Sequence, residues 1–250
     1  MNLILPKNIF TDILGSTLKN SYQKDYTLKP SALLSKDLTD KDIALIPALD
    51  IIQHKELFVS SKRGISFEGT LSNSYIYFSK TENVLKNIIL SGDVSAVEAI
   101  LTKIVFSELY EQEVSISLTN NSKENINQNM LLIGDANFES NNFLSGIPLT
   151  DEVNELTNLP FVNFIFASKN KELLKQFEEE TADIEKQVYA SIENSTWDCP
   201  YSDEVKTLFQ ENYTNLIYEF DSSDVSAMDE LLRLTFYHGI IKEIFEIKYT

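Results

Sequence analysis

Short apolar runs alternate along the chain with longer segments that have the spacing of a helix face. Most of the runs are continuous, which is typical of strands buried on both faces of a sheet. Pro47 ends one of them, and its fixed backbone fits the first turn of a following helix. The expected strands are 3–5, the start of 42–52, 72–79, a short strand at Ile88 and Ile89, 130–133 and 161–167.

Helical periodicity is clearest between Val94 and Leu109, where apolar residues recur every three or four positions. Strands that alternate with helices predict an α/β protein with mostly parallel sheets covered by helices. Ligands of such sheets bind at the carboxyl ends of the strands. Further helices are expected over about 11–19, 171–194, 203–213 and 224–245.

The composition fits a folded globular protein, since 43% of the 250 residues are hydrophobic and 24% are charged. A formal net charge of −17 argues against binding to nucleic acid or to anionic lipid surfaces. The apolar run 1–5 is too short for a secretory signal, and no run is long enough to span a membrane. We therefore expect a cytoplasmic protein without a membrane or nucleic-acid partner.

Several kinds of chemistry lack the residues that they need. Cys199 is the only cysteine, and the two histidines, His54 and His238, lie far apart. Neither the glycine-rich dinucleotide motif nor the P-loop motif occurs. Gly64-Ile-Ser66-Phe-Glu68 lacks the final glycine of a nucleophile elbow. The sequence therefore predicts no metal site and no cofactor.

Four segments share both their sequence and their order with one family: D-I-A-L-I-P at 42–47, G-I-S to F-S-K at 64–80, L-L-I-G-D-A at 131–136 and T-N-L-P-F-V at 157–162. In these segments the chain resembles the menaquinone-biosynthesis family that contains chorismate dehydratase of the futalosine pathway. The resemblance implies a two-lobed α/β fold like that of type II periplasmic binding proteins, with mixed sheets flanked by helices. One lobe would comprise 1–79 and 168–250 and the other 80–167. The crossing strands would be 75–79 and 161–167.

The resemblance also implies an activity. The family removes water from chorismate in the cleft between the lobes, which gives 3-[(1-carboxyvinyl)oxy]benzoate without a cofactor. The leading hypothesis is therefore a hydro-lyase whose partner is a small carboxylate. Two alternatives stay open: a protein that only binds a small aromatic or carboxylated metabolite, and the sister enzyme that acts on cyclic dehypoxanthinyl futalosine. The oligomeric state is left open.

Six polar residues fall where the family binds its ligand. Each also has a simpler interpretation: Ser95 can form a capping box with Glu98, Asp135 can cap the turn that follows its strand, and polar residues on a strand edge can face solvent. The expected ligand-binding residues are Ser72, Asn73, Ser74, Ser95, Asp135 and Asn158.

The region after the first strand departs from the family. Phe10 stands where the family has the asparagine tied to catalysis, and Thr11 aligns with its threonine. Phenylalanine can wall a pocket but cannot form the hydrogen bond. Asn8 and Thr11 are the nearest polar candidates for the catalytic role, and Phe10 is expected in the ligand-binding wall.

Overall fold

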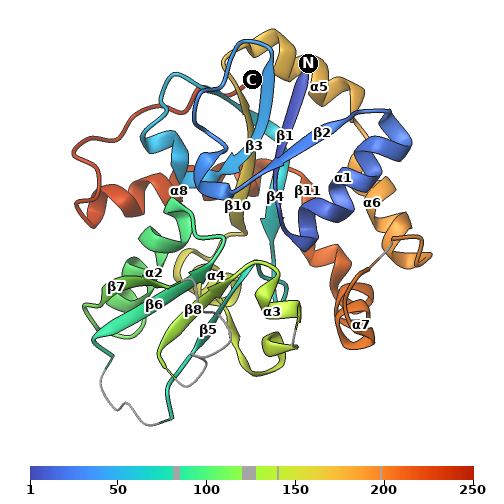
Figure 1. The fold of residues 1–250 in the computed structure, drawn as a ribbon. Helices are drawn as coiled ribbons and strands as arrows, with labels where there is room; N and C mark the ends of the chain where they lie inside the picture. The colour runs from blue at the N-terminus through green and yellow to red at the C-terminus, as the bar shows by residue number, and fades with distance from the viewer. Residues whose placement is uncertain (81–84, 120–127, 140, 198) are drawn as a thin grey trace.

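The computed structural model describes residues 1–80, 85–119, 128–139, 141–197 and 199–250, and within them it contains two separate β-sheets (Figure 1). The first has the order β11-β4-β10-β3-β1-β2 and the second the order β7-β6-β8-β5-β9. The first sheet is formed by β1 (Asn2–Pro6), β2 (Tyr26–Lys29), β3 (Asp42–Pro47), β4 (Phe58–Phe67), β10 (Phe161–Ser168) and β11 (Leu216–Glu219). The second is formed by β5 (Ser74–Tyr77), β6 (Asn87–Gly92), β7 (Ser115–Thr119), β8 (Met130–Ile133) and β9 (Ile147–Pro148).

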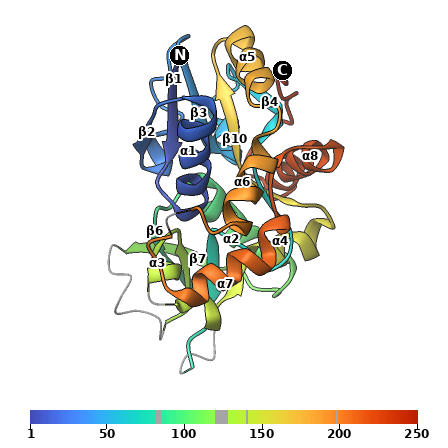
Figure 2. The same ribbon diagram turned by 90° about the vertical axis from the view of Figure 1, so that its right-hand side faces the viewer.

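Helices flank both sheets and give two α/β lobes (Figures 1 and 2). The first lobe carries α1 (Ile9–Tyr22), α5 (Lys171–Glu180), α6 (Ile184–Glu193), α7 (Asp203–Asn212) and α8 (Ser222–Tyr237), and the second α2 (Ala96–Glu108), α3 (Ala136–Glu139) and α4 (Leu149–Thr157). The short 3-10 helices are η1 (Ser31–Leu33), η2 (Ala48–Ile52), η3 (Asn142–Ser145) and η4 (Tyr213–Asn215). Among the described residues, no helix is long and apolar enough to cross a membrane.

The core of the first lobe lies around β3 and β10, in which every residue is buried. Both strands are covered on each face, which explains their continuous apolar sequences. The expectation of mostly parallel sheets holds for β1 with β2 and β3, and for β6 with β7 and β8. It is wrong for β4, β5, β9, β10 and β11, which pair antiparallel, so both sheets are mixed.

The chain passes between the lobes twice, at 68–73 and at 157–160. The strand β5 pairs only within the second sheet and β10 only within the first. The sheets therefore divide the chain at different points from the expected boundaries at 79 and 168. Both chain ends lie in the first lobe, where Tyr249 forms a bridge with Val59 of β4 (Figure 1).

The helix expected over 171–194 is two helices, because α5 ends at Glu180 and α6 begins at Ile184. The buried Arg63 of β4 explains the break. Its Nε donates to the carbonyl oxygen of Thr181 at 3.2 Å and its Nη2 to that of Glu178 at 3.4 Å. These carbonyl groups lie at the end of α5 and would otherwise lack partners.

The last helix is also shorter than expected. Instead of running to residue 245, α8 ends at Tyr237. Gly239 adopts a left-handed backbone with φ of +67°, and the N–H of Ile240 bonds to the carbonyl oxygen of Thr235 at 2.9 Å. This is a Schellman-type helix end, for which glycine is the favoured residue.

Candidate functional site

The start of α1 faces the second lobe, and its two polar side chains hold the helix terminus. Asn8 Oδ1 accepts from the N–H of Thr11 at 3.0 Å, and Thr11 Oγ1 accepts from the N–H of Asn8 at 3.2 Å. The Thr11 hydroxyl also donates to the carbonyl oxygen of Pro6 at 2.6 Å. Asn8 is 1% exposed and Thr11 is fully buried. Both proposed catalytic side chains are therefore engaged in a capping box.

Phe10 lies in a cluster of aromatic rings that joins the lobes. Its ring centroid is 4.8 Å from that of Phe67, 5.9 Å from Phe138 and 5.4 Å from Phe209. Phe138 belongs to the second lobe and the other three rings to the first. We call these four residues the interlobe aromatic cluster. All four are buried, so the space beside Phe10 is filled by side chains.

Asp135 joins the lobes next to this cluster. It follows β8, and its Oδ1 accepts from the N–H of Ile9, in the first turn of α1, at 2.8 Å. Burial raises the pKa of the Asp135 carboxyl, and the nearby Asp12 adds to the rise, while the bonds from Ile9 and Tyr201 oppose it. A carboxylate at a helix N-terminus is a favourable pairing. Asp135 therefore caps a helix of the opposite lobe.

The three polar residues before and at the start of β5 are buried. Ser72 Oγ donates to the carbonyl oxygen of Ser74 at 2.7 Å and accepts from the N–H of Thr150, at the start of α4, at 3.3 Å. Asn73 Oδ1 and Ser74 Oγ are buried and have no hydrogen-bond partner among the residues that the structure describes. Asn158 lies apart from them at the end of α4, exposed and in a left-handed conformation with φ of +54°. The segment 72–74 therefore faces the protein interior.

Ser95 forms the capping box with Glu98, and that box also reaches the other lobe. Glu98 Oε2 accepts from the N–H of Ser95 at 2.9 Å and from its hydroxyl. Glu98 Oε1 accepts from Asn163 Nδ2 of β10 at 3.4 Å. Burial raises the pKa of Glu98, against the hydrogen bonds that it accepts. This carboxyl is completely enclosed at the lobe junction.

An open cavity of about 390 Å³ lies at the lobe junction, and we call it the lysine cavity. It forms where three strands end: Lys7 follows β1, Lys29 ends β2, and Gly92 ends β6. The remaining lining residues are Leu28, Pro30 and Asp93. Gly92 has a φ of +105°, and a Cβ there would lie 2.0 Å from the carbonyl oxygen of Ile133, so only glycine fits. Strand ends of this kind are the usual ligand sites of α/β sheets.

The charged side chains of the lysine cavity differ in whether they have a hydrogen-bond partner. Both carboxylate oxygens of Asp93 are occupied by Ser31 of the first lobe, through its N–H at 3.0 and 3.1 Å and its hydroxyl at 2.7 Å. Within the described part of the chain, the ammonium groups of Lys7 and Lys29 form neither an ion pair nor a hydrogen bond, although Lys7 acts electrostatically on Asp12 and Asp135, and Lys29 on Asp42. Leu28, which is 43% exposed, supplies an apolar wall. The cavity thus offers two ammonium groups beside an apolar surface, together with one carboxylate that is already hydrogen-bonded.

Neither lysine was expected from the sequence, because β2 was not predicted. The available signal was weak. Lys7 follows Pro6, and Lys29 precedes Pro30, which is where a strand that cannot continue would end. The expected ligand-binding residues lie at the same lobe junction but mostly in its buried part.

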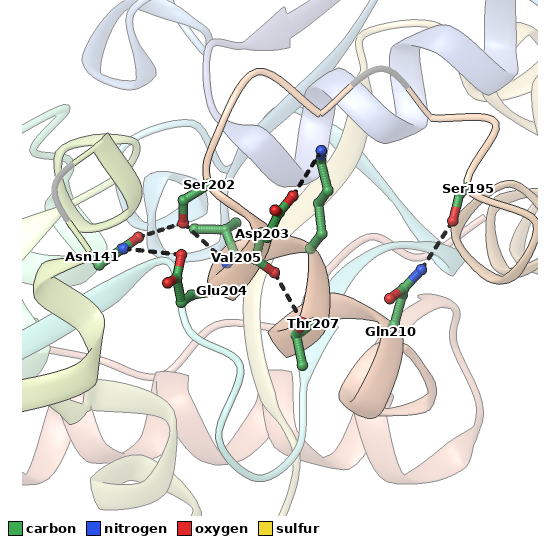
Figure 3. A network of polar contacts seen from close by, with 9 residues as sticks. Asn141, Ser195, Ser202, Asp203, Glu204, Val205, Thr207 and Gln210 are labelled. Atoms are coloured by element: carbon green, nitrogen blue, oxygen red, sulfur yellow. Dashed lines mark hydrogen bonds and ion pairs between the residues drawn. The ribbon is translucent and has the colours of Figure 1, made fainter.

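The segment around α7 adds a further contact between the lobes (Figure 3). Ser202, which caps α7, donates to Oδ1 of Asn141 in the second lobe at 2.7 Å, and Asn141 Nδ2 donates to Glu204 at 3.4 Å. Figure 3 shows Ser202 and Glu204 on the same side of the helix start, turned toward Asn141. We call these three residues the α7 clasp. Thus α7 is tied to the second lobe by both its aromatic and its polar side chains.

No protein-family model matches the sequence, and neither does any curated protein. Solved structures do match the fold. Protein AF1704 of Archaeoglobus fulgidus superposes with a TM-score of 0.64 at 12% identity, covering 96% of this chain and 98% of that one. The alkanesulfonate-binding protein SsuA of Xanthomonas axonopodis, bound to MOPS, gives 0.63 at 10% identity over 100% and 97%. A ligand-binding component of an ABC-type import system from Staphylococcus aureus, with zinc bound, gives 0.58 at 10% over 96% and 92%. The chain therefore has the two-lobed fold of type II periplasmic binding proteins.

Proposed function

We propose that the chain binds a small anion with an apolar body, such as an aromatic carboxylate, in the lysine cavity and releases it unchanged. The observation that carries the proposal is the pair of unpaired lysines, Lys7 and Lys29, at adjacent strand ends. Both lysines line one cavity without an ion pair among the described residues, and an anion bound there would supply a partner for both charges. A volume of about 390 Å³ is in the range of small-molecule sites.

The fold agrees with binding. SsuA of Xanthomonas axonopodis, which shares this architecture, is a binding protein for alkanesulfonates, anions with an apolar chain. In this chain, Leu28 and Pro30 would contact the apolar body of the ligand while the ammonium groups contact its charge. Hydrogen bonds to charged groups contribute about 1.5–3 kcal/mol each.

Dehydration of chorismate is the competing proposal, and the contacts at the start of α1 speak against it. Proton abstraction requires a free basic group within about 3 Å of the proton. Asn8 and Thr11 are buried and bonded to each other, and Phe10, which the resemblance aligns with the family's asparagine, cannot form its hydrogen bond. We therefore favour a protein that only binds its ligand over the hydro-lyase and over the enzyme that acts on cyclic dehypoxanthinyl futalosine.

The test combines calorimetric titration and mass spectrometry on the same samples, with chorismate, 3-hydroxybenzoate and an alkanesulfonate as probes. We expect saturable binding of at least one probe and no loss of water from chorismate. Lys29→Met and Lys7→Met should each weaken binding by about tenfold or more, because each removes a charged partner. The matched control is Lys175→Met, which changes the net charge equally at a half-exposed position of α5, where the ammonium group lies 3.9 Å from Glu172.

Two results would contradict the proposal. Loss of water from chorismate would establish the hydro-lyase instead. If Lys175→Met and Lys29→Met weaken binding equally, the lysines act only through the overall charge of the protein. The lysine cavity would then not be the binding site. Higher salt should weaken binding of the anion, since the cavity is open to solvent.

A further inference from the structure

A second cavity lies away from the lobe junction, between α1 and α6 on the outer side of the first lobe. Figure 2 shows these two helices side by side, with the chain leaving α6 toward α7. The cavity has a volume of about 390 Å³ and is lined by both helices and by the segment after α6. It shares no residue with the lysine cavity. We call it the α1–α6 cavity.

The lining of this cavity carries hydrogen-bonding groups and no charge. None of its 11 lining residues is Asp, Glu, Lys, Arg or His, although 24% of the chain is charged. Ser16, Asn20 and Ser21 are exposed, and their side chains form no hydrogen bond within the described residues. Gln187 and Asn194 of the facing wall add two further amides, whose nitrogens also donate to Asp183 at 3.4 Å and to the carbonyl oxygen of Ala190 at 2.8 Å. These groups can both donate and accept.

A tryptophan forms part of the same wall. Trp197 is the only tryptophan of the chain, and it is half-buried at the cavity. Its ring packs against Phe209 of α7, with ring centroids 5.1 Å apart and planes at 51°. This contact fixes the indole while part of it stays open to the cavity. A rigid aromatic face beside adaptable amides and hydroxyls is a common composition of binding surfaces.

We infer that the α1–α6 cavity binds a neutral polyhydroxylated molecule, such as a sugar. An ion would lose water without gaining a charged partner there, which makes an ionic ligand unfavourable. A sugar can place a C–H face against the indole of Trp197 and its hydroxyl groups against the amides of Asn20 and Gln187. The inference is independent of the anion site proposed above.

Trp197 provides the signal, because it is the only tryptophan of the chain and lines this cavity. It also lines a neighbouring cavity with Cys199 and Lys206, so substitutions in the α1–α6 cavity must locate the binding. The protein is titrated with glucose, galactose, mannose, maltose and trehalose up to about 50 mM, above the Kd of about 1–10 mM that a few hydrogen bonds provide. We expect a saturable change in emission with at least one sugar. Asn20→Ala, an exposed change on α1, should weaken that binding about three- to tenfold.

Lys29→Met serves as the control, because it alters the lysine cavity and should leave the sugar titration unchanged. The inference is overturned if no sugar gives a saturable change. It is also overturned if Asn20→Ala and Gln187→Ala both leave the Kd unchanged, or if Lys29→Met abolishes the signal, which would place the sugar at the lobe junction. Failure of this test leaves the anion proposal intact, since the two cavities are probed by different ligands.

Discussion

The lobes meet in two different ways on either side of the start of α1. On one side the interlobe aromatic cluster fills the interface with four buried rings. On the other side the lysine cavity remains open, and Asp93 and Ser31 join the lobes beside it. The first side buries apolar area and excludes water, whereas the second keeps charged groups in solvent. The same interface can thus hold the lobes together and still admit a ligand.

The difference also bears on how the lobes would separate. Opening the aromatic side exposes rings that each bury a large apolar area, at a cost of several kcal/mol. Opening the side of the lysine cavity breaks polar contacts such as the bonds between Asp93 and Ser31, which water can replace. We therefore expect the lobes to open as a wedge, widest at the lysine cavity, with the aromatic side acting as the pivot.

The largest expected effect comes from removing a buried ring from the interlobe aromatic cluster. Phe138 contacts Phe10, Tyr75, Phe143, Tyr201 and Phe209. Phe138→Ala should lower the free energy of unfolding by about 3–5 kcal/mol, because it removes a buried ring and leaves a cavity. Urea denaturation measures this. Phe236→Ala, at a ring that is 37% exposed, is the matched control and should cost far less. A loss below about 1 kcal/mol for Phe138→Ala would show that the cluster does not hold the lobes together.

The sequence predicted the apolar strands and one capping box, but it did not predict the strands β2 and β4. The strands β1, β3, β8 and β10 were predicted because they are continuous apolar runs, and Ser95 with Glu98 was recognised as a possible capping box. The strand β4 was not predicted, since its middle, 60–64, is polar. Those residues serve contacts across the fold: Ser60 donates to Glu178 at 2.6 Å, and Arg63 binds the end of α5.

The sequence also missed the lysine cavity, because that cavity is formed by contacts between residues that are far apart in the sequence. A capping residue or an apolar strand is defined by its neighbours in sequence, so the pattern reveals it. The lysine cavity depends on β2 lying beside β1 and on β6 approaching from the other lobe. The interlobe role of Glu98 likewise depends on Asn163, 65 positions away. Such contacts follow from tertiary structure and leave little trace in local sequence.

The second prediction concerns pH and the enclosed junction at Glu98. Burial raises the pKa of this carboxyl above its ordinary value of 4.5, so the folded state retains a proton that the unfolded chain releases above that pH. The free energy of unfolding should therefore fall as pH rises above about 4.5, by at most about 1.4 kcal/mol per pH unit for this one group, until the folded-state pKa is passed. A protonated Glu98 could also donate to Asn163 Oδ1, which has no partner among the described residues, after a 180° turn of that amide.

Glu98→Gln removes this titration and keeps the shape of the side chain. Its stability relative to the wild type should rise as pH increases from 4.5, and the difference should level off above the folded-state pKa. Chemical denaturation at several pH values measures the difference. Glu155→Gln, at an exposed position of α4, controls for the change in net charge. Parallel curves for the wild type and Glu98→Gln would mean that Glu98 is ionised in the folded protein over this range.

The smallest expected effect separates the α7 clasp from the aromatic side beside it. Asn141 has a left-handed backbone with φ of +55°, which glycine adopts freely. Asn141→Gly therefore removes the bonds to Ser202 and Glu204 without backbone strain, and stability should change by less than about 1 kcal/mol. Hydrogen exchange should nevertheless become faster at the first turn of α7, where Ser202 loses its partner, and stay unchanged in α1. Asn141→Ala loses the same bonds and adds left-handed backbone strain of about 1 kcal/mol. The difference in the free energy of unfolding between the two variants therefore measures this strain. If exchange in α7 is unchanged in Asn141→Gly, the apolar contacts of α7, such as that of Phe209 with Phe138, are enough to hold this helix against the second lobe, and the polar clasp adds nothing.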